Sequence, residues 1–421
     1  MKNKGDHFLK EVTNHIKSKE ARNFVTTELT FHLKKAKGFW QEKGLSDDTA
    51  EEKAVEQMGS PVKLGQELNR LHKPKVDWML IALLAAAMGL GFLPIITLDY
   101  TEAFLVQKII IVLFGVVAAV GIMLFDYRKI ERFGWVFYIL GSFLLLTLRY
   151  FPTTMIHGQS YIAFGIITIE SLMALPFFFL AWASFLNNPK VRIWQMVLLF
   201  IFSFYLFFSI PNLSIALIYT VMVFVMLWWS QFSKKKVMLM TAVPFVLTAS
   251  GGVPFFLAAD AYQMHRLMGY LSPEKYADAA GFMYLRLEEI FSSAGWFGTT
   301  GGFEFIPYAH TDYVFASMTF YYGYAFAFIL VLILSLFAIR MIMISRHMNS
   351  SFGKLLLTGS MTLFIVQFVY NIAMMLGLLP LTSISLPFIS YGLMPTLFNA
   401  FLIGIVLSVY RRKSLVSGSF A

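Results

Sequence analysis

Long apolar runs alternate with short polar segments over most of this 421-residue chain. As helices, runs of about 20 apolar residues cross the roughly 30 Å hydrocarbon core of a bilayer, and the sequence contains ten such runs. They start near Trp78, Phe104, Phe133, Tyr161, Ile193, Leu213, Val237, Tyr313, Leu355 and Tyr391. Because the runs are continuous rather than short alternations, a β-barrel is excluded. The pattern predicts an all-α, polytopic membrane protein with about ten transmembrane helices.

The composition agrees with this class, because 58% of the residues are hydrophobic and only 14% are charged. A soluble globule is therefore excluded. The polar character of the first 76 residues argues against a cleavable signal peptide. The chain has no cysteine, so disulfides and thiolate metal sites are excluded. Nothing in the sequence suggests nucleic acid as a partner.

Residues 1–75 differ from the rest in composition, with 15 Lys or Arg and 11 Asp or Glu. The pattern predicts three or four short amphipathic helices. Ser46 is expected to cap one of them, Gly59 to end it, and Ser60 with Pro61 to begin the next. The run GLSDDTAEEKAVEQMGSPVKLGQEL resembles HAAS-type prefix domains of bacterial membrane proteins. We therefore expect a cytoplasmic interaction module with an unknown partner at 1–75, an inert cap being the alternative, followed by a membrane domain at 76–421.

Basic residues gather at alternate ends of the apolar runs. RKIER at 128–132, KKK at 234–236 and RRK at 411–413 all fall on one side, and the opposite connections are nearly free of Lys and Arg. The positive-inside rule then predicts that both termini are cytoplasmic. On the opposite side, a long loop at about 259–312 carries seven of the 12 carboxylates that follow Asp77. Long loops are usually functional.

The most specific motif is NIAMMLGLLPLTSISLPFISYG at 371–392. Its prolines and hydroxyl residues leave backbone carbonyls unpaired, which membrane depth tolerates only beside packed protein or a cavity. The part LGLLPLTSISLPFISYG resembles the signature of the SEDS family, the FtsW, RodA and SpoVE group of shape, division and sporulation proteins. Four more blocks resemble that family in its own order, SIPNLSIAL (209–217), YQMHRLMGYLSPEKY (262–276), SSAGWFGTTGG (292–302) and YAHTDYVFA (308–316).

The resemblance implies a ten-helix peptidoglycan glycosyltransferase of the bacterial plasma membrane. Such enzymes polymerise lipid II, an undecaprenyl-diphosphate-linked disaccharide, into β(1→4) glycan strands beside a class B penicillin-binding protein. It implies Asp312 as the catalytic carboxylate. The substrate-binding residues that it implies are Arg266, His310, Asn371, Pro387, Ser390, Tyr391 and Gly392.

Joining two lipid-linked sugars needs a base for the acceptor hydroxyl, and a partly desolvated carboxylate suits that role. Arg266 is the best candidate to stabilise the diphosphate, and a divalent cation is an additional candidate. Each residue also has a simpler interpretation. Asp312 could serve as the N-cap residue of the eighth helix, and His310 could be an interfacial side chain without a catalytic role. Arg266 could extend to the lipid headgroups without contacting substrate.

Several positions depart from the family pattern. Leu172 and Leu175 occupy the places of a Glu and Lys pair, Asn212 and Ser214 replace Asp and Gly, and Leu393 follows the SYG motif instead of glycine. A catalytically inactive scaffold, sensor or precursor transporter is therefore the alternative function. We interpret Glu170 as the one intramembrane charge of the helices. An ion-coupled transporter is therefore disfavoured, because ion relays use several intramembrane acids or bases.

Overall fold

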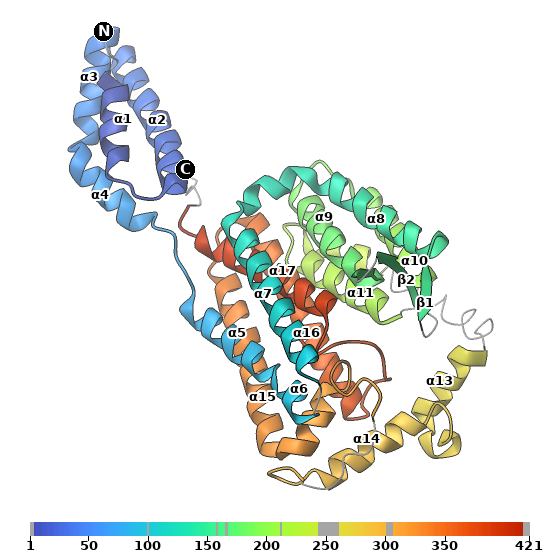
Figure 1. The fold of residues 1–421 in the computed structure, drawn as a ribbon. Coiled ribbons are helices and arrows are strands. Elements are labelled where there is room, and N and C mark those ends of the chain that lie inside the picture. Colours follow the sequence, from blue (N-terminus) through green and yellow to red (C-terminus); the bar gives the residue numbers. More distant parts are fainter. Residues whose placement is uncertain are drawn as a thin grey trace. The chain divides into compact units, whose positions relative to one another are not determined.

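The computed structural model describes residues 4–98, 101–156, 159–164, 167–210, 213–242, 261–299 and 306–415 (Figure 1). Of the sequence expectations, those for Asn212, Asp260, Glu304 and the end of the SSAGWFGTTGG block lie outside these residues. The chain forms two compact units. One contains Met1–Asp77 and Tyr410–Ala421, and the other contains Trp78–Val409.

The first unit contains four helices, α1 (Lys4–Asn14), α2 (Lys19–Glu42), α3 (Asp47–Met58) and α4 (Pro61–Leu71). The expected boundaries of α3 and α4 are confirmed, with Ser46 and Ser60 as N-cap residues. Gly59 ends α3 at φ 78°, a left-handed conformation that glycine adopts without strain. Apolar side chains of these helices and of the connection between α1 and α2 form one core, whose fully buried members include Val12, Ile16 and Val25.

The segment after the last apolar helix belongs to this same core. Leu415 is 1% exposed and packs with the helices' apolar side chains. Arg412 is buried, and its Nη2 lies 2.6 Å from Oε1 of Glu20. Nδ1 of His72 is 2.7 Å from the carbonyl oxygen of Ser414. The unit is therefore closed by a piece of chain more than 300 residues away in sequence.

We expect Glu20→Gln to release this C-terminal segment, because the buried Arg412 guanidinium would lose its carboxylate. Breaking a buried pair costs about 3–5 kcal/mol, and about 2 kcal/mol is expected here because Glu20 is partly exposed. Hydrogen exchange of the full chain measures the effect as faster exchange at Leu415, whose amide bonds to the Arg412 carbonyl. Glu42→Gln, on the exposed end of α2, should leave that rate unchanged; equal rates in both variants would contradict the prediction.

The second unit is almost entirely helical. Its helices are α5 (Trp78–Leu90), α6 (Leu93–Thr97), α7 (Glu102–Leu124), η1 (Tyr127–Phe133), α8 (Gly134–Tyr150), η2 (Ser171–Ala174), α9 (Leu175–Asn187), α10 (Ile193–Ser209), α11 (Leu213–Trp228), α13 (Ala261–Leu271), η3 (Pro273–Tyr276), α14 (Phe282–Ser293), α15 (Val314–Arg346), α16 (Ser351–Met375) and α17 (Leu393–Arg411). Residues 234–242 are also helical.

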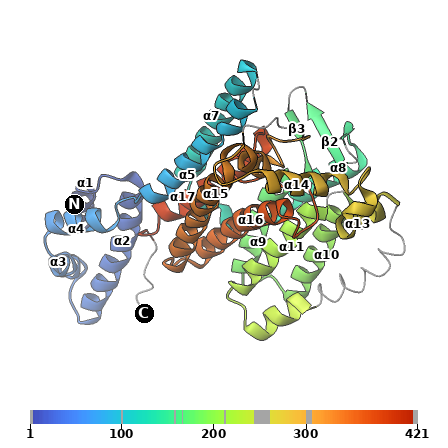
Figure 2. The same ribbon diagram turned by 90° about the horizontal axis from the view of Figure 1, so that it is seen from below.

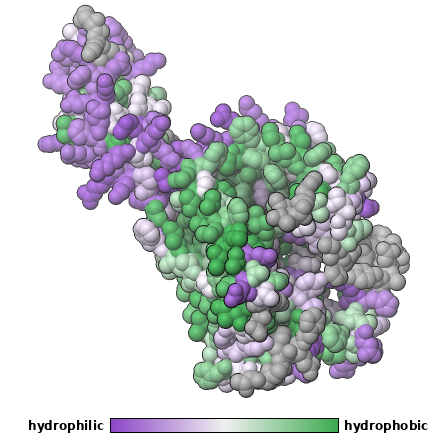
Figure 3. Space-filling view, in the orientation of Figure 1, coloured by the Kyte–Doolittle hydropathy of each residue, from purple (hydrophilic) through white to green (hydrophobic). Residues whose placement is uncertain are grey.

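Within the described residues, six helical segments are long and apolar enough to cross a membrane, and three shorter apolar helices accompany them. The long segments are Trp78–Thr97, Glu102–Leu124, Tyr127–Tyr150, Val314–Arg346, Ser351–Met375 and Leu393–Arg411. Figure 3 shows hydrophobic surface over this unit and hydrophilic surface over the first unit. Such a large apolar surface is expected where lipid rather than water surrounds the helices.

The expected fourth span near Tyr161 is wrong at its start. Residues there form a three-stranded antiparallel sheet of β1 (Thr154–Ile156), β2 (Gln159–Phe164) and β3 (Ile167–Ile169). Thr154 pairs with Tyr161, and Ile162 pairs with Ile169. The stretch is rich in β-branched and aromatic residues, which favour strands. The helix begins only at η2 and α9, where Pro176 occupies the first turn.

Helix α15 is interrupted at Gly323, which has φ 79° and ψ 178°. The amides that follow bond to another segment, since Tyr324 N donates to Gly295 O and Ala325 N donates to Trp296 O. A Cβ at Gly323 would overlap the backbone of residues 296–298. The kink and the preceding loop therefore depend on glycine at this position.

Gly323→Ala is expected to destabilise the membrane unit by about 3 kcal/mol or more, because both the left-handed φ and the overlap oppose the side chain. Thermal unfolding in detergent measures the loss. Gly377→Ala is the matched control, since Gly377 has φ 70° but no atom within 4 Å of a Cβ. If both substitutions lower the melting temperature equally, the overlap has no role.

Candidate active site

The candidate site is formed by a turn at residues 307–313, immediately before α15, and the segment 384–392, immediately before α17. Three hydrogen bonds hold these segments. Tyr391 N donates to His310 O at 2.9 Å, and the Ser390 hydroxyl donates to Thr311 O at 2.7 Å. Leu386 N donates to the Ser390 hydroxyl oxygen at 2.8 Å. Ser390 therefore connects the two segments through its side chain.

Asn371 supports both segments from α16. Its side chain is completely buried, and its Nδ2 donates to the carbonyl oxygens of Asp312 at 3.0 Å and Ile384 at 2.6 Å. Buried backbone carbonyls in irregular segments need such partners, because water does not reach them. One amide thus fixes the backbone at Asp312 and the beginning of the 384–392 segment.

Asp312 is half-buried. The N-cap residue of α15 is Tyr313, which makes no side-chain cap bond, so the alternative use of Asp312 as a helix cap is not observed. Among the described residues, none donates a hydrogen bond to its carboxylate. Burial raises the pKa of Asp312 to about 6, since desolvation disfavours the charged form. The carboxylate is thus held in place through its backbone, and its oxygens can accept a proton.

A second carboxyl group, Glu170, lies close enough to respond to the charge of Asp312. It precedes η2, at the end of the β-sheet rather than inside a helix. Burial, and then the negative charge of Asp312, raise the pKa of Glu170 to about 7. Burial followed by both carboxylates raises the pKa of Tyr161 to about 12, so that phenol keeps its proton. The sheet that the sequence did not predict therefore brings titratable groups to Asp312.

His310 and Tyr391 lie in an aromatic cluster with Phe104 of α7. The ring centroids are 5.5 Å apart for His310 and Tyr391, and 6.0 Å apart for His310 and Phe104. The Tyr391 hydroxyl donates to Oε1 of Gln107 at 2.7 Å. Burial, and then the charge of Lys108, lower the pKa of His310. His310 is therefore a neutral, packed side chain near pH 7 rather than a cation.

Arg266 is exposed on α13, and Figure 2 shows this helix beside α14. Its Nη2 lies 3.4 Å from Leu381 O. Nearby, the Tyr270 hydroxyl donates to Leu378 O at 3.0 Å, and Leu381 N donates to the Tyr284 hydroxyl at 2.9 Å. Arg266 thus contacts the loop that follows α16. Its positive charge opposes the rise that burial causes in the pKa of Tyr313, whereas the pKa of Asp312 is raised by burial alone.

Pro387 and Gly392 flank the part of the segment that contacts Asp312's turn. Pro387 is buried, and Gly392 has φ 149° and accepts from the Thr396 hydroxyl at 2.7 Å. Between them Phe388 has φ 67°, unusual for a bulky residue, and its ring packs on Phe337 and Phe364. These positions shape the backbone rather than present side chains toward Asp312.

Sequence reasoning missed Lys108. It is buried in the span Glu102–Leu124, and its Nζ donates to Ser390 O at 3.0 Å. The interpretation that the helices lack intramembrane charges apart from Glu170 is therefore wrong. A lone lysine inside an apolar run is a signal for a functional position. The signal is weak here because Lys108 lies close to the start of its apolar run, which begins near Phe104.

The described residues contain no group of three metal-ligating side chains. Among the described residues, the carboxylates that interact at the Asp312 turn are Glu170 and Asp312, which is fewer ligands than a divalent cation takes from a preformed protein site. The described side chains alone do not fit a resident metal.

A profile of the FtsW, RodA and SpoVE family, described as cell cycle protein, matches residues 77–415. The chain belongs to the SEDS family. It is therefore a multi-pass membrane protein, as its apolar helices indicate. Within this SEDS protein, Leu175 is completely buried and Leu172 half-buried, so packed apolar side chains occupy the two positions at which the resemblance predicts a charged pair.

Curated relatives resemble parts of this SEDS chain. It is 27% identical over 175 residues to the "Probable peptidoglycan glycosyltransferase FtsW" of Trichlorobacter lovleyi, covering 40% of the chain and 44% of the relative. It is 30% identical over 171 residues to the "Peptidoglycan glycosyltransferase MrdB" of Escherichia coli K12, covering 39% and 46%. The matches thus span less than half the length of these relatives.

Solved structures share the fold over a longer part of the chain. One, from work on the structural coordination of polymerization and crosslinking by a peptidoglycan synthase complex, has a TM-score of 0.70 and 22% identity, and covers 80% of this chain and 98% of the other. The crystal structure of Thermus thermophilus rod shape determining protein RodA has a TM-score of 0.60 and 20% identity, covering 80% and 97%. The SEDS fold expected from the sequence is confirmed.

Proposed function

We propose that this protein is a peptidoglycan glycosyltransferase that polymerises lipid II into β(1→4) glycan strands. The observation that carries the proposal is Asp312, a half-buried carboxylate with a pKa near 6 whose backbone is fixed by the buried Asn371. A base works best when its pKa lies near the working pH. The names of the matched relatives support the same reaction class.

The chemistry follows from the carboxylate. Asp312 takes the proton of the acceptor sugar hydroxyl while that oxygen forms a bond to the anomeric carbon of the donor. The bond from that carbon to the diphosphate breaks, and the diphosphate leaves with the electron pair. Direct displacement inverts an α-linked donor to a β linkage. Arg266, which is exposed beside the loop after α16, supplies positive charge for the leaving diphosphate.

We further infer that lipid II reaches Asp312 from the outer face and that both termini are cytoplasmic, as the distribution of Lys and Arg indicates. A class B penicillin-binding protein is the partner that would crosslink the strands. The related structure from a peptidoglycan synthase complex supports a partner of this kind. The first unit, which contains residues 1–75, would then receive a cytoplasmic signal.

The test is polymerisation of purified lipid II by the full chain, with and without a candidate class B penicillin-binding protein. Glycan strands resolved on a gel would establish the enzyme. The specific observation favouring an inactive scaffold or precursor transporter is the pair of packed leucines, Leu172 and Leu175. That function would be preferred if the folded protein gave no strands with the partner present.

The polymerisation rate should fall as the pH drops through about 6, because the base must be ionised and burial raises the pKa of Asp312 to that value. Glu170→Gln removes the neighbouring carboxyl group, whose own pKa of about 7 lies above that of Asp312. Because Glu170 is still protonated while Asp312 ionises, its removal should leave the acidic limb near pH 6. A rate profile from pH 5 to 8 measures this, and a shifted limb in Glu170→Gln would contradict the order of the two pKa values.

A further inference from the structure

Lys108 is a charged residue whose surroundings the proposed reaction does not explain. It is 1% exposed within a transmembrane span, and its Nζ donates to Ser390 O at 3.0 Å and Ile389 O at 3.5 Å. Among the described residues, no carboxylate forms an ion pair with it. An ammonium has three donors, so at least one remains for another acceptor. A buried charge of this kind is costly unless an opposite charge approaches it.

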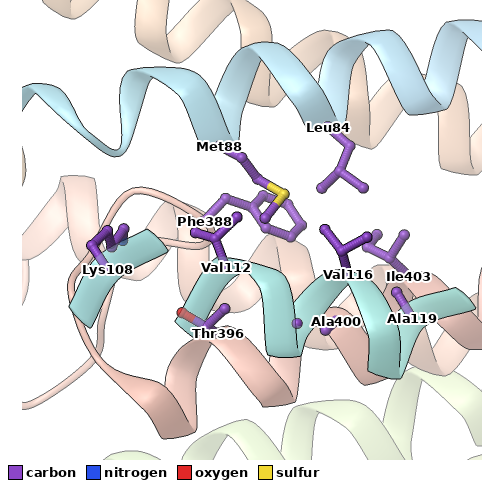
Figure 4. Close-up of a pocket in the computed structure, with 11 residues that line it drawn as sticks. Leu84, Met88, Lys108, Val112, Val116, Ala119, Phe388, Thr396, Ala400 and Ile403 are labelled. Carbon is purple, nitrogen blue, oxygen red and sulfur yellow. The ribbon is translucent and has the colours of Figure 1, made fainter. Parts of the chain in front are cut away.

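An apolar cavity extends from Lys108 between α5, α7 and α17 (Figure 4). Its walls carry Leu84 and Met88 from α5, Val112 and Val116 from α7, and Ala400 and Ile403 from α17. From Lys108 to Ala119, the last α7 residue in the wall, the helix rises about 16 Å. The cavity is therefore a narrow apolar groove that has one lysine among its lining residues.

The cavity is accessible from the side of α7. Val116 lines it and is 43% exposed, and other α7 side chains such as Leu113 and Val117 are more exposed still. Because this exposed surface belongs to a transmembrane span, lipid chains surround it. A lipid chain can thus enter laterally, whereas water does not reach this depth.

We propose that this cavity binds one acyl chain of an anionic membrane phospholipid and that the lipid phosphate pairs with Lys108. The charge and the apolar walls select a ligand with an anionic head and an apolar chain. Lys108 contacts the backbone carbonyls of Ile389 and Ser390, whereas the hydroxyl of Ser390 is directed to the Asp312 turn. The lipid therefore supports the segment that holds the site, without being the substrate.

The first experiment measures lipid retention, which does not depend on the proposed function. The full chain is placed in nanodiscs that contain phosphatidylglycerol, released, and weighed by native mass spectrometry. The wild type is expected to keep one phosphatidylglycerol. The fraction of protein that retains the lipid should be at least tenfold lower in Lys108→Met. It should be unchanged in Lys108→Arg, because arginine retains the positive charge.

A second pair of variants leaves Lys108 unchanged. Val116→Trp places an indole at the accessible side of the cavity and is expected to exclude the chain. Val117→Trp is the matched control, since Val117 is 69% exposed on the same helix and does not line the cavity. Loss of the lipid in Val116→Trp and its retention in Val117→Trp would support the site even if Lys108→Met fails to fold.

Three results would overturn the proposal. Equal retention of phosphatidylglycerol in both tryptophan variants would show that the retained molecule is annular lipid outside the cavity. A retained mass of undecaprenyl phosphate in place of phosphatidylglycerol, in membranes that supply both, would assign the cavity to the isoprenoid chain. Retention of the lipid by both Lys108→Met and the wild type would show that Lys108 does not bind the lipid phosphate and only donates hydrogen bonds to the carbonyl oxygens of Ile389 and Ser390.

Discussion

Asp312→Asn is expected to lower glycan polymerisation at least 100-fold, since a positioned base contributes about 10²–10⁴ to the rate. The substitution keeps the size of the side chain. It also keeps the backbone carbonyl that accepts from Asn371, so the turn should retain its conformation. Initial rates of lipid II polymerisation, measured with the partner present, give the effect.

The matched control for this substitution is Glu288→Gln, an exposed carboxylate on α14 that precedes the same turn in sequence. Its rate should equal that of the wild type. A rate above one tenth of the wild type in Asp312→Asn would show that this carboxylate is not the base. Equal melting temperatures in the three proteins would confirm that the loss is chemical.

Asn371→Leu is expected to lower the maximal rate about 100-fold, because a displacement of about 1 Å at a reacting group has an effect of that size. The variant leaves the carbonyls of Asp312 and Ile384 without their buried donor, at a cost of about 1–3 kcal/mol each. Faster hydrogen exchange in residues 307–313 should accompany the loss of activity.

Gln367→Leu provides the control on the same helix, one turn before Asn371. Gln367 is also buried, but its Nε2 donates only within α16, to Leu363 O at 2.8 Å. It should reduce stability with little change in rate. Asn371 is a positioning residue if the rate falls only in its own variant and the acidic limb of the pH profile shifts there. Equal losses in both variants would indicate a general effect on packing.

The departures from the family pattern have a structural consequence. Leu172 and Leu175 are packed at the positions where the resemblance predicts a charged pair, and the loss of both members of a pair leaves no orphaned charge. Glu170 still interacts with Asp312, from a position before η2. The site therefore combines two carboxyl groups, Glu170 and Asp312, whose charges interact.

The apolar runs determined the class, the helical fold and the position of most spans, because a long continuous run has few alternatives to a transmembrane helix. Local signals were equally decisive in the first unit, where Ser46, Gly59 and Pro61 marked the helix ends correctly. Five contiguous motifs were enough to indicate the SEDS family. In each case the information lies within a few neighbouring residues or in one contiguous motif.

Only the tertiary structure decided what surrounds Asp312. The apolar run that starts near Tyr161 predicts a helix, but its first residues belong to strands β2 and β3, since such a run does not distinguish a helix from a strand without its pairing partners. Asn371 bonds to Asp312 across 59 positions, and Lys108 bonds to Ser390 across 282. Periodicity along the chain does not encode such pairs, because their geometry depends on how the helices pack.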